Sequence, residues 1–373
     1  MNSDKIILAP YYWALRLRHF LYNKGIKKSQ RAPVPTICVG NLAVGGTGKT
    51  PFTEMLLRLL SSSAETAAPG LTNEAAVPGA RECKVGVLSK GYGRKSKGFL
   101  YVEPDEKMTV LGASAKKRLS AAEKYGDEPL QIKRKFPSVP VAVCSSRIEG
   151  CRQMAQDGCE RIILDDAFQH RALQADLNIV LIEYNRPLAK DHLLPLGRLR
   201  DIPERIHAAD IIIASKCPEY LSEEEKAAWI QSLRLRPDED KPVFFTHLAY
   251  ATPCPVFDEG DKHYLYAQKM IVISGIANDR PMVGYLSGQY QMSAHLRFPD
   301  HHAFTASDLK SMEKAATKTP NAIILTTEKD SQRLRPLGDK ISPNVRQRLF
   351  YLPIETKFLT PEDEEKFIHQ LLF

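Results

Sequence analysis

Residues 39–51 read Val-Gly-Asn-Leu-Ala-Val-Gly-Gly-Thr-Gly-Lys-Thr-Pro and form a glycine-rich turn between an apolar run and an amphipathic segment. Glycine adopts backbone angles that are closed to other residues, so successive N–H groups of such a turn converge on an anion at the start of a helix. Lys49 is placed to reach the β- and γ-phosphates of a nucleotide, and the Thr50 hydroxyl to reach a magnesium ion. We therefore predict a nucleotide-binding loop formed by Gly45, Gly46, Thr47, Gly48, Lys49 and Thr50.

The residues on either side of the turn support this prediction. Residues 36–39 have the continuous apolar pattern of a buried parallel strand, and large apolar residues recur at helical spacing after the turn. The strict pattern G-x-x-x-x-G-K-[ST] fails at its first position, where Ala43 stands. A glycine-rich loop without a ligand is the alternative, but strand, turn and helix together favour a nucleotide site.

Composition and charge limit the size and the partners of the protein. The chain has 373 residues, of which 43% are hydrophobic, so it can bury a large core and is expected to form two domains. A net charge of +8 favours an anionic partner, which nucleic acid, an acidic lipid surface and a phosphorylated substrate all satisfy. The seven cysteines include no C-x-x-C pair, and no signal-peptide pattern is visible, which favours a reducing, cytoplasmic compartment.

The alternation of apolar strands with helical segments predicts the fold. We expect a P-loop NTPase-like doubly wound parallel sheet, of the α/β class, with a second, smaller α/β domain that carries no second P-loop. A shift in composition near residues 236–242 marks the domain boundary. The expected parts are an amphipathic N-terminal helix at 1–30, a kinase domain at 31–240 with a flexible insertion at 61–82, linker strands at 241–267 and the second domain at 268–373.

The N-terminal segment mixes aromatic and aliphatic residues with arginine and lysine. Its apolar run is too short and too interrupted by charge to span a bilayer. A helix of this composition suits the membrane interface, where rings enter the headgroup layer and basic groups meet anionic lipid. A helix packed on its own domain is the alternative.

Paired carboxylates end one of the apolar strands. Asp165 and Asp166 follow the run at 161–164, which is the pattern of a Walker B element, where carboxylate oxygens hold Mg²⁺ beside the P-loop. A solvated turn is the alternative reading, which the P-loop makes less favourable. A later strand ends in Ser-Lys-Cys-Pro at 215–218, without the aspartate that follows lysine in guanine-specific P-loop proteins, so adenine is the expected base.

Three further motifs contain candidate functional residues. Tyr92 and Arg94 follow a strand, where ligands bind in open α/β sheets, although a plain glycine-rich turn with solvated basic residues fits nearly as well. Asp127 and Glu128 begin a helix, where acidic residues also serve as simple caps. The Pro-Asp-His-His run at 299–302 indicates, by itself, a turn or a metal site.

Taken in chain order, these motifs resemble the tetraacyldisaccharide 4′-kinase family of lipid A biosynthesis. The likeness covers nearly the whole chain and is specific as a series. It rests on the residues at 40–41, 45–51, 89–94, 126–129, 164–170, 299–302 and 326–330.

The resemblance implies transfer of the γ-phosphate of ATP to the 4′-hydroxyl of a tetraacylated glucosamine disaccharide 1-phosphate, which gives lipid IV-A at the cytoplasmic face of the bacterial inner membrane. It implies that Asp127 is the general base, paired with His301 of the second domain. It also implies a set of Mg²⁺ ligands, which are Thr50, Glu128, Asp165 and Asp166. The residues expected near the lipid substrate are Arg147, Gln169 and His170, with Tyr92 and Arg94.

The expected partners are the lipid-linked disaccharide and the membrane surface, with no nucleic acid and no obligatory protein partner. The chain departs from the commoner family pattern at Lys90, Ala167, Leu196 and Arg198. Of these, Lys90 and the Leu-Pro loop that contains Leu196 and Arg198 bear on how lipid phosphate or sugar is held. Two other functions stay open, a P-loop synthetase or ATPase with a soluble substrate, and a membrane-recruited nucleotide switch. A phosphorylated lipid product distinguishes the kinase from both.

Overall fold

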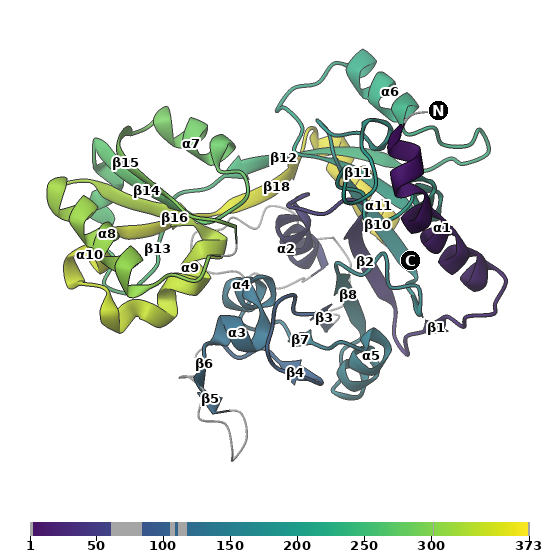
Figure 1. Cartoon of the computed structure of the whole chain (residues 1–373), viewed down its shortest axis with the longest axis horizontal. Helices are drawn as coiled ribbons and strands as arrows, with labels where there is room; N and C mark the ends of the chain where they lie inside the picture. The colour runs from purple at the N-terminus through teal and green to yellow at the C-terminus, as the bar shows by residue number, and fades with distance from the viewer. Residues whose placement is uncertain (1–2, 61–83, 105–108, 111–117, 301, 372–373) are drawn as a thin grey trace.

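The structure is a computed structural model that describes residues 3–60, 84–104, 109–110, 118–300 and 302–371. The expected insertion at 61–82 lies outside the described residues, and so does His301. Figure 1 shows two lobes, a larger one that holds the N-terminal half of the chain and a smaller one, green to yellow, at the left. Each lobe is built around its own β-sheet.

The sheet of the larger lobe is mostly parallel. Its nine strands are, in spatial order, β18 (Ile354–Phe358), β12 (Val243–Tyr250), β11 (Ile211–Ser215), β10 (Leu177–Glu183), β2 (Thr36–Asn41), β8 (Arg161–Asp165), β3 (Val85–Ser89), β7 (Val141–Val143) and β4 (Leu100–Tyr101). Neighbours from β12 to β7 run parallel, whereas the edge strands β18 and β4 are antiparallel to their neighbours. All residues of β2 are buried, as expected for a central parallel strand covered on both faces.

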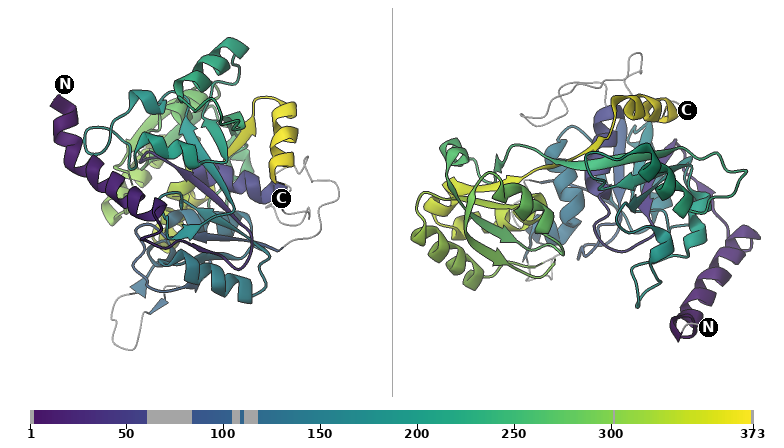
Figure 2. Two further views of the ribbon diagram at one scale, coloured as in Figure 1. Left: turned by 90° about the vertical axis from the view of Figure 1, so that its right-hand side faces the viewer. Right: turned by 90° about the horizontal axis from the view of Figure 1, so that it is seen from above.

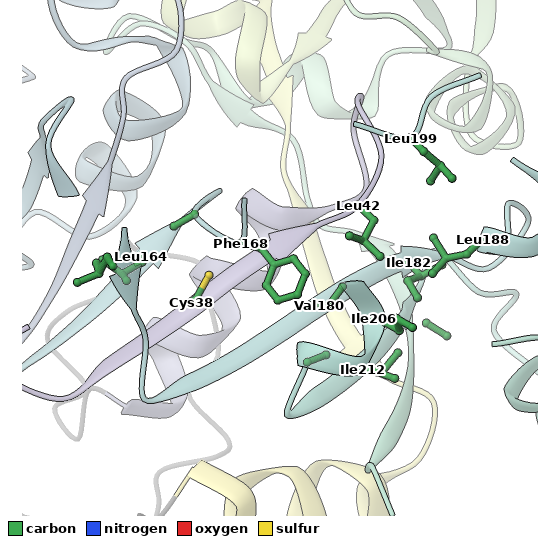
Figure 3. Packing of buried hydrophobic residues seen from close by; sticks show 14 of the residues in the cluster. Cys38, Leu42, Leu164, Phe168, Val180, Ile182, Leu188, Leu199, Ile206 and Ile212 are labelled. Carbon is green, nitrogen blue, oxygen red and sulfur yellow. The ribbon is translucent and has the colours of Figure 1, made fainter. Parts of the chain in front are cut away.

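Helices cover both faces of this sheet. Because side chains alternate along a strand, Cys38 of β2 belongs to the core on one face and Ile37 to the core on the other. Figure 3 shows part of the first core, where Phe168 lies between Cys38 and Val180. The predicted doubly wound sheet is therefore confirmed. The helices that contribute are α1 (Ser3–Asn23), α5 (Arg147–Gln156) and α6 (Glu223–Ser232) on the first face, and α2 (Lys49–Leu60), α4 (Asp127–Lys135) and α11 (Pro361–Leu371) on the second.

The smaller lobe has a five-stranded sheet with the order β13 (Cys254–Pro255), β17 (Leu349–Leu352), β16 (Ile323–Thr327), β14 (Lys269–Ser274) and β15 (Gln291–Arg297). All neighbours are parallel except β13 and β17. Separate apolar cores lie on its two faces, so it is a second α/β unit as predicted. Its helices are α7 (Arg280–Ser287), α8 (Ala306–Lys318), α9 (Glu328–Leu334) and α10 (Pro343–Arg348).

The remaining elements are short. They are β1 (Gln30–Arg31) paired with β9 (Leu173–Gln174), β5 (Thr109–Val110) paired with β6 (Arg118–Leu119), α3 (Ala121–Tyr125), and the 3₁₀ helices η2 (Leu188–Lys190), η3 (Pro203–Ala208), η4 (Lys262–Tyr266) and η5 (Arg335–Lys340).

The end of the chain returns to the larger lobe, whereas the sequence places all of 268–373 in the second domain. In β18, Thr356 pairs with Leu248 of β12, and Phe358 and Phe367 join the same core as Phe52 of α2. Likewise β12 is an integral strand of the large sheet and not only a linker. Two chain segments thus cross between the lobes, β12 outward and β18 on the return (Figure 1).

Candidate active site

The glycine-rich turn connects β2 to α2 and has the geometry of an anion-binding loop. Gly45 and Gly48 have φ angles of +103° and +85°, which lie in the left-handed region that favours glycine. Lys49 and Thr50 open α2, so the first N–H groups of this helix face the turn. Asn41 Nδ2 donates to Thr47 Oγ1 at 2.8 Å, so that Thr47 holds the turn against β2.

The strand-end acids lie directly behind this turn. Strand β8 pairs with β2, with Asp165 in register with Val39. Lys49 Nζ is 3.6 Å from Asp166 Oδ1, and Arg200 Nη1 donates to Asp166 Oδ2 at 3.0 Å. Arg147 is buried, and its Nη2 donates to the backbone carbonyls of both acids at 3.2 Å. The acidic turn is thus fixed by cations on several sides.

The two acids have opposite electrostatic properties. Burial raises the pKa of Asp165 to about 7, and the negative charges of Glu128 and Asp166 add to this effect. Burial opposes ionisation of Asp166 too, but its hydrogen bond from Arg200 and the charge of Lys49 lower its pKa to about 2. Asp166 is therefore an ion-paired carboxylate, and Asp165 is a carboxylate that lacks sufficient positive charge.

The carboxylate of Asp165 is buried, and neither of its oxygens has a hydrogen-bond partner within the described part of the chain. Within those residues, His, Cys, Asp and Glu form no cluster of three or more suited to hold a metal. Mg²⁺ commonly uses one or two protein carboxylates and takes its other ligands from phosphates and water.

Asp127 lies at the contact between the lobes. It begins α4, and Arg333 of α9 donates through Nε to Asp127 Oδ2 at 2.9 Å. Arg333 also donates through Nη1 to Asp330 Oδ1 at 3.0 Å, and Asp330 accepts from the Gly275 N–H at 2.8 Å. The second lobe therefore supplies a buried cation to this carboxylate. Its expected pairing with His301 stays a prediction, because His301 lies outside the described residues.

Comparison with known proteins assigns the family. The family model described as tetraacyldisaccharide-1-P 4′-kinase matches residues 5–69 and 75–372. The chain belongs to this family. The tetraacyldisaccharide 4′-kinase of Phocaeicola vulgatus is 36% identical, with 96% of this chain and 92% of the relative aligned, and that of Flavobacterium johnsoniae is 36% identical, with 96% and 94% aligned.

A solved structure of the family supports the same fold. The crystal structure of LpxK from Aquifex aeolicus in complex with ATP is 28% identical to this chain, with a TM-score of 0.67 and 99% of each chain covered. The sequence-based prediction of the fold and of the kinase family is therefore confirmed.

The five residues expected near the substrate of this kinase family fall into two groups. Arg94, Arg147 and Gln169 use their polar groups to bind backbone carbonyls: Arg94 donates to the Gly98 carbonyl at 2.7 Å, Gln169 donates to the Asn41 carbonyl, and Arg147 donates to those of the acidic turn. Tyr92 is 81% exposed after β3, and His170 is half-buried after the acidic turn. Burial, with the nearby charges of Arg147 and Arg18, lowers the pKa of His170, so the neutral imidazole is favoured.

Two arginines that bind the candidate site acids were not among the residues predicted from the sequence. Arg200 binds both Asp166 and Asn41, and the loop that carries it pairs with the glycine-rich turn, since Val44 N donates to the Arg198 carbonyl at 2.7 Å. A Cβ on Gly45 would lie 3.0 Å from Arg198 Nη2, so glycine permits this approach. Arg333 is the second. Its spacing of three from Asp330 on one helix was the available signal.

Helix α1 presents two different faces. On the inner face, His19 and Asp201 are buried with His19 Nε2 2.6 Å from Asp201 Oδ1, and Arg18 donates to the Gln169 carbonyl at 2.6 Å. On the outer face, the exposed large apolar residues are Trp13, Leu17 and Phe20, which are 63%, 59% and 51% exposed. Figure 2 shows α1, in purple, on the side of the larger lobe remote from the second lobe. Within the described residues, no helix has the length and apolar content needed to cross a bilayer.

Proposed function

We propose that this chain is the kinase that transfers the γ-phosphate of ATP to the 4′-hydroxyl of tetraacyldisaccharide 1-phosphate and so produces lipid IV-A. The observation that carries the proposal is the acidic strand end behind the P-loop. Lys49 lies 3.6 Å from Asp166, whereas both oxygens of Asp165 lack a partner among the described residues. This is the arrangement that phosphoryl transfer requires, since the reaction depends on fixed positive charge around the transferred group.

Different residues bind the phosphates, stabilise the transferred group and accept the proton of the attacking hydroxyl. N–H groups of the glycine-rich turn and of the start of α2 bind the phosphates, and Lys49 stabilises the negative charge that develops on the γ-phosphoryl group. A sugar hydroxyl is a weak nucleophile at neutral pH, so Asp127 takes its proton as the new P–O bond forms. Arg333 keeps the Asp127 side chain oriented through hydrogen bonds to Oδ2.

A magnesium ion fits the orphaned oxygens of Asp165. We propose that Asp165, the Thr50 hydroxyl, Asp166 and Glu128 would hold it. When bound, the ion neutralises charge on the β- and γ-phosphate oxygens. Arg200 restrains Asp166, and the 3.7 Å contact of Lys329 Nζ with Glu128 Oε1 restrains the other acid.

We also propose that His301 supports Asp127 from the second lobe. The support is the position of the residues around it. A Cβ on Gly275 would lie 3.5 Å from the Pro299 carbonyl, and the Gly275 carbonyl accepts from Arg333 Nη1 at 3.4 Å. The Pro299 carbonyl therefore lies near Gly275, whose own carbonyl accepts from the arginine that binds Asp127.

The outer face of α1 is the proposed contact with the lipid phase, at the cytoplasmic face of the inner membrane. Its three large apolar side chains are exposed on a helix whose opposite face is anchored by buried polar contacts. A groove of about 740 Å³ adjoins the end of α1 and carries Lys27, Lys28 and Arg31 among its lining residues. Apolar side chains beside lysine and arginine suit an anionic lipid surface.

The substrate contacts are proposed in the same two groups that the geometry separates. Tyr92 and His170 touch the disaccharide or its phosphate, because their side chains are accessible. Arg94, Arg147 and Gln169 shape the site through their contacts with backbone carbonyls.

The test is direct phosphorylation of the lipid. Purified protein is incubated with Mg-ATP and a tetraacylated disaccharide 1-phosphate, and the products are identified by mass spectrometry, with Asp127→Asn as the inactive control. A doubly phosphorylated lipid with the parent protein alone supports the proposal. ATP hydrolysis without any phosphorylated lipid overturns it and favours an ATPase or a nucleotide switch.

A further inference from the structure

The contact between the lobes contains three ionisable side chains to which the mechanism above gives no role. Lys135, at the end of α4, is 7% exposed, Glu328, at the start of α9, is 7% exposed, and Glu54 of α2 is fully buried. Lys135 Nζ lies 2.6 Å from Glu54 Oε2 and 3.1 Å from Glu328 Oε1. One ammonium group thus joins the P-loop helix, the helix of the proposed base and the second lobe.

Neighbouring groups complete the hydrogen bonds of this triad, which still has two carboxyl groups for one ammonium group. Gln131 Nε2 donates to Glu54 Oε1 at 2.9 Å, and Arg58 on α2 pairs with Glu355 of β18 at 3.3 Å. Burial raises the pKa of Glu328 to about 7, and the charge of Glu54 adds to this, against the effect of Lys135. The other titratable groups facing the triad are Arg58, and Cys254 and Tyr351 of the second lobe.

Such a triad is a poor device for stability. Removing several charged groups from water costs free energy that their mutual attraction often fails to recover, and apolar replacements of buried ion pairs are commonly neutral or stabilising. An ammonium group between two carboxylates fixes the distance and the direction from each carboxylate to the nitrogen, because each hydrogen bond tolerates little displacement. The triad is therefore better explained by the position that it imposes on its helices.

The position in question is that of the proposed catalytic base. Asp127 begins α4 and Lys135 ends it, eight residues later, a span of about 12 Å at the rise of an α-helix. At its other end α4 contacts α9 through Asp127 with Arg333 and Glu128 with Lys329. In Figure 1, α4 lies between α2 and α9. A rotation of α4 about the triad would displace Asp127 from the P-loop.

We propose that Lys135 is a positioning residue which, through Glu54 and Glu328, sets the distance between Asp127 and the P-loop and keeps the second lobe docked. The inference rests on the proposed kinase function for its catalytic consequence. Loss of the ammonium group removes the hydrogen bonds from Lys135 Nζ to Glu54 and Glu328, so the contact of α4 with α2 and α9 weakens. Lipid phosphorylation then falls, whereas ATP binding, which uses α2 and the glycine-rich turn, is retained.

The experiment compares Lys135→Met, Lys135→Arg and a control on the same helix, Lys133→Met. Lys133 is a suitable control because its Nζ donates to the carbonyls of Pro137 and Val139, outside the triad. We expect Lys135→Met to lower kcat for lipid phosphorylation by about 10²-fold, as small misplacements of reacting groups do, with KM for ATP changed less than about two-fold. Lys135→Arg restores most of kcat, and Lys133→Met behaves as the parent.

A second measurement does not depend on activity. Hydrogen exchange of the nucleotide-free protein should show faster exchange of α4 and α9 amides in Lys135→Met, with the strands of the large sheet unchanged. Unchanged exchange at α4 and α9, or equal losses of kcat and ATP affinity, overturns the positioning role. If the parent protein itself does not phosphorylate the lipid, the proposed function fails, and the exchange experiment still decides whether Lys135 docks the lobes.

Discussion

Two regions of the molecule each bury a carboxyl group whose pKa is raised to about 7. One is the end of β8, which buries Asp165, and the other is the contact of α2, α4 and α9, which buries Glu328. They differ in their partners. Glu328 Oε1 has Lys135 Nζ at 3.1 Å, whereas neither oxygen of Asp165 has a hydrogen-bond partner among the described residues. A buried acid with its cation in place holds helices together. For a buried acid whose oxygens are unsatisfied beside a P-loop, we propose a role in binding a cation together with the nucleotide.

The largest expected effect is at the unsatisfied acid. Asp165→Asn removes the charge that binds the metal, so we expect kcat to fall by about 10²-fold or more, as for other groups that stabilise charge in phosphoryl transfer. Lys49→Ala should fall by a similar factor. Initial rates of lipid phosphorylation check both variants, with the exposed Asp238→Asn as a matched control. Turnover near that of the parent in Asp165→Asn would remove the metal role from β8.

A comparable loss is expected at Asp127, but with a different signature. Asp127→Asn removes the acceptor of the hydroxyl proton and leaves the phosphate-binding residues intact. General-base catalysis contributes about 10²- to 10⁴-fold to the rate, so we expect kcat to fall by a factor in this range. Calorimetric titration should therefore show ATP affinity close to that of the parent. If Asp127 and His301 act as one unit, His301→Ala lowers kcat similarly and the double variant is little worse than Asp127→Asn alone. Losses that multiply would instead assign His301 an independent role.

The sequence predicted the features that depend on residues close together in the chain and missed those that depend on residues far apart. The glycine-rich turn, the acidic strand end and the start of α4 at Asp127 are local patterns, and the structure has them where expected. Arg200 with Asp166 and Arg333 with Asp127 join residues 34 and 206 positions apart. The local periodicity of a sequence does not indicate which residues so far apart in the chain will pair. For the same reason the return of β18 to the larger sheet was missed, because its apolar pattern does not say which sheet it joins.

The pH dependence of stability should separate the two buried acids. The pKa of Asp165 and of Glu328, ordinarily 3.8 and 4.5, is raised to about 7 in the folded protein. The folded state therefore binds more protons than the unfolded state between these values, and the resulting stability is lost as pH rises through about 7. Without metal, we expect the midpoint of thermal unfolding to fall from pH 6 to pH 8.

The two acids should then respond differently to ligand and to substitution. Mg-ATP replaces the proton on Asp165, so its stabilising effect should be larger at pH 8 than at pH 6. Glu328→Gln should reduce the pH dependence and leave the response to Mg-ATP in place, with the exposed Glu223→Gln as the control. The comparison breaks down if Mg-ATP stabilises the protein equally at both pH values, or if Glu328→Gln abolishes the response.

The smallest expected effect on catalysis concerns the two faces of α1. Replacing Trp13, Leu17 and Phe20 with serine alters side chains that are more than half exposed, so the fold should persist. Binding to anionic vesicles should weaken, because each lost ring or aliphatic chain removes apolar contact with the lipid interface. The apparent KM for lipid in vesicles should rise several-fold, with ATP affinity unchanged.

The inner face of the same helix supplies the control. Leu15 is 7% exposed, and Leu15→Ala should lower the free energy of unfolding by about 2–5 kcal/mol, as truncation of buried leucines does. Thermal unfolding and vesicle flotation, measured on both variants, separate a membrane contact from a packing contact. If the serine variant loses stability as Leu15→Ala does, the outer face is part of the core in solution. If it binds vesicles as the parent does, the lipid contact lies elsewhere, and the basic groove at the end of α1 becomes the next surface to alter.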